Sequence, residues 1–89
     1  MVYCVVERYY KSDMEITMMK DVELNKYLTT VLINDLSVDK SEVIGLNLSD
    51  KISYLEDELN ETYEDSDVSI SGIIIVDEKN RTLIDWYRG

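Results

Sequence analysis

The chain has 89 residues, of which 19 are acidic and nine are basic, giving a formal net charge of −10. This charge argues against direct binding to nucleic acid, because such binding needs cations that displace phosphate counterions. His and Pro are absent and there is one Cys, so the usual sets of metal ligands and activated nucleophiles are missing, and no internal disulfide can form.

The longest apolar runs, residues 2–6 and 73–76, are far shorter than the roughly 20 residues that span a bilayer. Glu7 and Arg8 come too early in the chain for a signal peptide. No linker, repeat or low-complexity tract interrupts the sequence. We therefore expect a single domain over residues 1–89, cytoplasmic and without a membrane partner.

Composition also indicates an origin. The chain has no Ala, Gln, Pro or Phe, while Ile, Asn, Asp, Lys and Tyr are plentiful. Because GC-rich codons encode Ala and Pro, this profile is typical of an AT-rich genome, such as those of many Gram-positive bacteria and their phages.

The first segments predict a β-hairpin. Residues 2–10 alternate two faces of β-branched and aromatic side chains, and residues 14–19 alternate again after a short polar break. Cys4 shares a face of the first strand with Val2 and Val6, which predicts a small buried hydrophobic residue rather than a reactive thiol.

Two later segments have the three- and four-residue spacing of helices. Residues 22–36 follow Asp21, which we expect to be the N-cap, and residues 49–65 begin at Ser49 as N-cap, with one leucine-rich stripe. Between them, residues 37–48 fit either a short strand or one helical turn.

The chain ends in a second predicted hairpin, formed by strands at residues 68–76 and 81–87 around a polar turn. Two hairpins that flank two helices predict an α+β fold with the order β-β-α-α-β-β. Its small antiparallel sheet would be covered by the two helices on one face. We expect Ile73 and Ile75 to lie on the uncovered face and to form a homodimer interface, since apolar residues occupy both faces of that strand.

The strongest functional signal is an acidic run. Residues 50–67 hold eight acidic residues and one lysine, a net charge of −7. If this segment is helical throughout, its length gives about one charge per 3.4 Å, the phosphate spacing along one DNA strand. The ordinary explanation is a solvated helix face, and the alternative is a surface that binds a basic partner. The residues expected to contact that partner are Asp57, Glu58, Glu61, Glu64, Asp65 and Asp67.

Metal and catalytic sites have little support. A calcium loop of the EF-hand type that began at Asp65 would need Gly at its sixth position and Glu at its twelfth, where the chain has Ile70 and Val76. The three glycines form no phosphate-binding loop. We therefore expect no enzyme activity, no cofactor and no metal.

The sequence as a whole predicts a non-enzymatic acidic binding protein. Its most concrete form is a phage-encoded inhibitor that mimics nucleic-acid phosphates and blocks a basic groove of a host or defence protein. Two alternatives stay open at this point. One is a dimeric module that binds and sequesters a nucleotide or similar small molecule, and the other is a structural or assembly protein.

Overall fold

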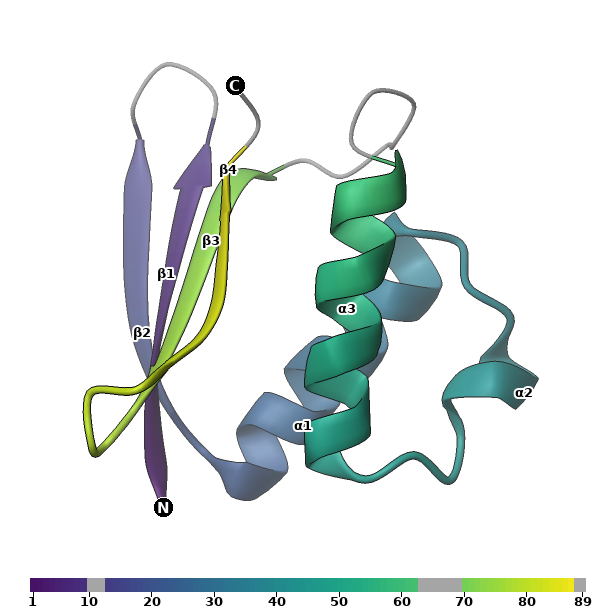
Figure 1. The fold of residues 1–89 in the computed structure, drawn as a ribbon, viewed down its shortest axis with the longest axis horizontal. Helices are drawn as coiled ribbons and strands as arrows, with labels where there is room; N and C mark the ends of the chain where they lie inside the picture. Colours follow the sequence, from purple (N-terminus) through teal and green to yellow (C-terminus); the bar gives the residue numbers. More distant parts are fainter. Residues whose placement is uncertain (10–12, 63–69, 88–89) are drawn as a thin grey trace.

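The computed structural model describes residues 1–9, 13–62 and 70–87, which form a sheet with helices on one side (Figure 1). The predicted α+β fold is confirmed. In chain order, the elements are β1 (Val2–Tyr9), β2 (Met14–Lys20), α1 (Asp21–Thr30), the π-helix η2 (Val31–Asp35), α2 (Lys40–Val43), α3 (Leu48–Thr62), β3 (Ile70–Asp77) and β4 (Thr82–Tyr87).

The sheet is antiparallel throughout and has the strand order β2-β1-β3-β4. Each hairpin therefore supplies one central and one edge strand. Val5 of β1 pairs with Thr17 of β2 and with Ile75 of β3, and Ile75 pairs in turn with Ile84 of β4. This register puts Val5, Ile75 and Ile84 on the face of the sheet that the helices cover, and all three are fully or almost fully buried.

Helix α1 buries Leu24 and Leu28 and continues directly into η2. The wider turn of a π-helix changes the direction of successive side chains, and here the neighbours Val31 and Leu32 are both buried. The predicted cap was wrong: α1 starts at Asp21 itself, with no side-chain cap from the residue before it.

The ambiguous segment forms the helical turn α2 rather than a strand. The carboxylate of Asp39 accepts a hydrogen bond from the backbone N–H of Ser41 (3.1 Å) and caps this turn. Helix α3 is capped in the same way by Asn47, whose Oδ1 accepts from the N–H of Asp50 (2.8 Å), so the predicted cap at Ser49 was also misplaced. The predicted end of this helix, residues 63–65, lies outside the described residues.

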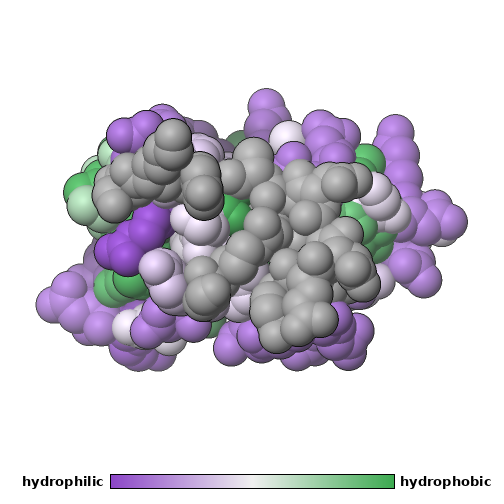
Figure 2. Space-filling view, turned by 90° about the horizontal axis from the view of Figure 1, so that it is seen from above, coloured by the Kyte–Doolittle hydropathy of each residue, from purple (hydrophilic) through white to green (hydrophobic). Residues whose placement is uncertain are grey.

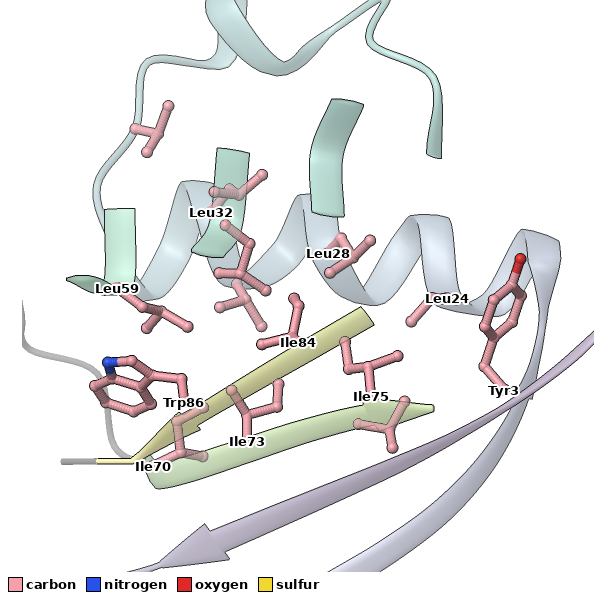
Figure 3. Close-up of a cluster of buried hydrophobic side chains, with 14 of the residues drawn as sticks. Tyr3, Leu24, Leu28, Leu32, Leu59, Ile70, Ile73, Ile75, Ile84 and Trp86 are labelled. Carbon is pink, nitrogen blue, oxygen red and sulfur yellow. The ribbon is translucent and has the colours of Figure 1, made fainter. Parts of the chain in front are cut away.

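The core lies between the sheet and the helices α1 and α3. Figure 3 shows the leucines Leu24, Leu28, Leu32 and Leu59 pointing down toward isoleucines and Trp86 of the sheet. Among the described residues, no helix combines the length and the apolar character needed to cross a bilayer.

The turn between β3 and β4 is organised by the buried carboxylate of Asp77. It accepts hydrogen bonds from the backbone N–H groups of Lys79 and Arg81 (both 2.9 Å) and from Nε of Arg81 (2.8 Å). The hydrogen bond from the Arg81 backbone is the main reason why the pKa of Asp77 is lowered. Asn80 takes up the left-handed backbone conformation (φ 60°) that such a tight turn requires.

Candidate functional site

The charge of the molecule is concentrated on the helical side. We call residues 21–62 the helical layer; they contain ten acidic residues and three lysines, a net charge of −7. The described residues of the two hairpins contain six acidic and four basic residues, a net charge of −2. A positively charged partner is therefore attracted most strongly to the helical layer.

Helix α3 carries the most regular part of this charge. Asp50, Asp57 and Glu61, which we call the acidic stripe, lie within about 40° of one another around the helix axis. All three are exposed, on the side opposite the buried Leu55 and Leu59. Within the described residues, none of their carboxylates takes part in an ion pair. The acidic stripe is therefore available to an external cation.

The structure brings half of the predicted contact residues together. Asp57 and Glu61 belong to the acidic stripe, and Glu58 lies half-buried on the flank of the same helix. The remaining three predicted residues, Glu64, Asp65 and Asp67, lie outside the described residues.

The basic residue of α3, Lys51, does not neutralise the acidic stripe. Lys51 is only 8% exposed, and its side chain reaches across to α1, where Nζ donates hydrogen bonds to Oδ1 of Asn25 and to Oγ1 of Thr29 (2.9 Å). Sequence reasoning missed this role. The signal for it was present, because Lys51 lies four residues before Leu55, beside the apolar stripe of the helix.

One acidic residue of α2, Glu42, contacts α3. Oη of Tyr54 donates a hydrogen bond to Oε2 of Glu42 (3.0 Å), and this bond raises the pKa of Tyr54. The contact ties the end of α2 to α3, and Asp39 caps the same short helix. The helical layer therefore offers acidic side chains from two helices rather than one.

The uncovered face of the sheet is a second candidate surface. The prediction that Ile73 and Ile75 form an interface there is wrong, since both point into the core beneath the helices and are 1% and 0% exposed. Strand β3 turns its other face outward, where Ile74 is exposed and Val76 half-buried. The sequence does not distinguish the buried residues of this strand from the outward-facing ones, because Ile73–Val76 is apolar at every position.

We call the uncovered side of the four strands the open sheet face. Residues that pair across neighbouring strands share a face, so the register in β1–β4 defines its members. Figure 2 shows hydrophobic residues reaching the surface at the sheet end of the molecule, among hydrophilic ones. Its apolar members are Val2, Cys4, Val6, Met14, Ile16, Met18, Ile74, Val76 and Tyr87.

A hollow of about 290 Å³ lies on the open sheet face next to Gly72. A Cβ atom at Gly72 would come within 3.1 Å of Cδ2 of Tyr87, so the glycine gives the tyrosine ring room to lie across the strand. Cζ of Arg8 lies 5.3 Å from the centre of that ring, a cation–π contact. Asp85 lines the same hollow. A phosphate-binding pocket would gather several cations, and among the described residues this hollow is lined by one.

The described residues give no support to metal or thiol chemistry. They contain no group of three or more His, Cys, Asp or Glu side chains that could hold a metal ion. The predicted burial of Cys4 is only partial: it lies half-buried on the open sheet face, beside Met18 and Val76 on the neighbouring strands.

The hydroxyl groups of two tyrosines near Glu7, Tyr9 and Tyr27, stay protonated at neutral pH. Oη of Tyr9 donates to Oε2 of Glu7 (3.0 Å), and partial burial together with this bond raises the pKa of Tyr9 to about 12. The hydroxyl of Tyr27 is buried and has no hydrogen-bond partner among the described residues. Burial, followed by the charge of Glu7, raises the pKa of Tyr27.

Comparison of the chain with protein-family models, with curated proteins and with solved structures finds no match. Function must therefore be inferred from the two surfaces, the acidic helical layer and the open sheet face.

Proposed function

We propose that the protein is a non-enzymatic binding protein whose helical layer occupies a basic, nucleic-acid-binding surface of another protein. The observation that carries the proposal is the acidic stripe, whose three carboxylates are exposed and unpaired among the described residues, next to further acids of the same layer. The lysine of α3 is turned away from them.

The density of charge supports mimicry of nucleic acid. Four acidic residues lie within the six positions 56–61, which span about 9 Å of helix and give about one charge per 2 Å. Duplex DNA carries one charge per roughly 1.7 Å of its axis. These four acids point in different directions around the helix, and Glu58 is half-buried, so a basic groove would meet a comparable charge density only where it wraps around α3 and reaches Glu56 as well as the acidic stripe.

The position of these acids in the helix also favours binding over stability. Glu61 lies in the last turn of α3, which contains no basic residue. Anions there are unfavourable by about 0.3–1 kcal/mol, because the helix dipole makes this end negative. Selection for folding alone would favour lysine or arginine in this turn.

The proposal also covers the class of partner and the origin of the protein. The protein is a phage-encoded inhibitor, and its target is a host or defence protein that binds nucleic acid. The composition typical of an AT-rich genome supports the origin, and the net charge of −10 supports a basic target rather than nucleic acid itself.

The test uses two variants with the same change in charge. The stripe variant carries Asp50→Asn, Asp57→Asn and Glu61→Gln. The control carries Asp13→Asn, Glu15→Gln and Glu78→Gln, three exposed acids of the hairpins. Each protein is immobilised, incubated with a lysate of Gram-positive bacteria, and the captured proteins are identified by mass spectrometry.

The proposal expects wild type and control to capture a nucleic-acid-binding protein and the stripe variant to lose it. Exposed ion pairs contribute only ~0.2–1 kcal/mol each, so the loss should build up over the three substitutions. The captured protein, once purified, should release a DNA oligonucleotide when wild type is added. If all three proteins captured the same partner equally well at low salt, the acidic stripe would not be the binding surface, and the proposal would be contradicted.

A further inference from the structure

The open sheet face lacks a cover within the described structure. Within the described ranges, the helices that pack on the sheet, α1 and α3, lie on its opposite face (Figure 1). Eight large hydrophobic residues are exposed among the described residues, and five of them gather on this one face. These five are Met14, Ile16, Met18, Ile74 and Tyr87. A contiguous exposed apolar patch of this kind marks an interaction surface.

The charges on the open sheet face differ from those of the rest of the chain. The face carries Arg8, Lys20 and Asp85, a net charge of +1 on a protein whose total is −10. Two copies repel each other wherever their acidic layers approach. The open sheet face is the surface through which they can meet while the helical layers point away from each other.

We propose that a second copy of this chain covers the open sheet face, giving a two-fold symmetric dimer in which two sheets pack face to face. A two-fold interface joins a patch to itself, so it requires a surface that complements itself. A nearly neutral apolar face with both Arg8 and Asp85 meets this requirement. A strongly charged partner would instead require a face whose charges all have the opposite sign.

The area of the open sheet face agrees with a small interface between two copies. Four strands spaced about 4.8 Å apart, with about six residues each at about 3.3 Å, give a flat footprint of roughly 400 Å² per chain. Protruding methionine, isoleucine and tyrosine side chains enlarge the accessible area beyond this footprint. Two such faces together approach the ~1,000 Å² that a specific interface needs.

The dimer is independent of the proposed function, because the acidic stripe lies on the opposite side of the molecule. The test compares Ile16→Lys and Ile74→Lys on the open sheet face with Ile44→Lys as a matched control. Ile16 and Ile44 are equally exposed, at 62% and 63%, but Ile44 lies on the helical side, at the end of α2. All three variants introduce the same charge at an exposed isoleucine.

Sedimentation velocity and light scattering, from about 1 to 200 µM protein, give the mass of each variant. Wild type and Ile44→Lys should reach twice the chain mass of 10.4 kDa. Ile16→Lys and Ile74→Lys should keep the wild-type circular dichroism spectrum and dimerise at least tenfold more weakly.

Two results would overturn the proposal. The first is a wild-type protein that has the mass of a single chain even at the highest concentration. This result would contradict the dimer whether or not the open sheet face binds a different protein. The second is a dimer that Ile16→Lys and Ile74→Lys leave intact, which would place its interface elsewhere.

Discussion

Nζ of Lys51 on α3 lies 2.9 Å from Oγ1 of Thr29 on α1, so a buried ammonium group links the two helices through a neutral hydroxyl rather than through a carboxylate. Oδ1 of Asn25 is its second acceptor. The positive charge of Lys51 thus lies inside the helical layer. It does not neutralise the acidic residues on the outer side of α3.

The substitution Lys51→Ala should lower the free energy of unfolding by about 1–3 kcal/mol, because it leaves Asn25 and Thr29 without their donor in a partly buried site. Lys26→Ala removes the same charge from the exposed side of α1 and should change stability by less than about 0.5 kcal/mol. Urea unfolding followed by circular dichroism measures both. Equal values for the two variants would contradict a structural role for Lys51.

Acidification should weaken the β3–β4 turn through Asp77. The pKa of Asp77 in the folded protein lies below the ordinary value of 3.8, so its contribution to stability is complete above that value. The contribution is lost as the pH falls through the lower folded pKa. The stability difference between wild type and Asp77→Asn should therefore shrink below about pH 4.

The measurement for Asp77 is thermal unfolding of both proteins between about pH 2 and pH 7. Asp57→Asn is the control, since the exposed carboxylate of Asp57 makes no hydrogen bond or ion pair among the described residues. A stability difference for Asp77→Asn that stays constant over this range would contradict the lowered pKa.

Two neighbouring residues of β3 should respond oppositely to the same change. Ile73→Lys puts a charge without a partner into the core and should cost at least about 3 kcal/mol, enough to unfold much of the protein. Ile74→Lys points to the open sheet face and should leave the chain folded. Circular dichroism and thermal melting separate the two outcomes, and similar melting temperatures would mean that the faces of β3 have been assigned wrongly.

The two ends of the acidic stripe should have opposite effects on folding. Asp50 lies in the first turn of α3, where the helix dipole favours an anion, and Glu61 lies in the last turn, where it does not. Asp50→Asn should therefore lower stability by about 0.3–1 kcal/mol, while Glu61→Gln should raise it by a similar amount. Melting at low salt tests this, and both effects should fade in about 1 M salt, where screening is strong.

Periodicity was sufficient to predict the four strands and the two long helices, because each has an alternating or three-to-four-residue apolar pattern. It did not decide between a strand and the short helix α2, whose four residues are fewer than the pattern needs. The caps were misplaced by one or two residues, since Asn47 and Ser49 are both good caps and only the fold selects between them. The direction of Ile73 and Ile75 depends on their register with β1, which an all-apolar segment does not encode. The role of Lys51 depends on the packing of α1 against α3.

The segregation of charge also has an effect at long range. Among the described residues, a helical layer of net charge −7 faces away from hairpins of net charge −2, which gives the molecule an electric dipole moment. In the field of a positively charged surface, such a molecule rotates before contact and arrives with its helices first. Orientation during approach raises the association rate constant more than it slows dissociation. Added salt should therefore act mainly on the rate at which such a complex forms.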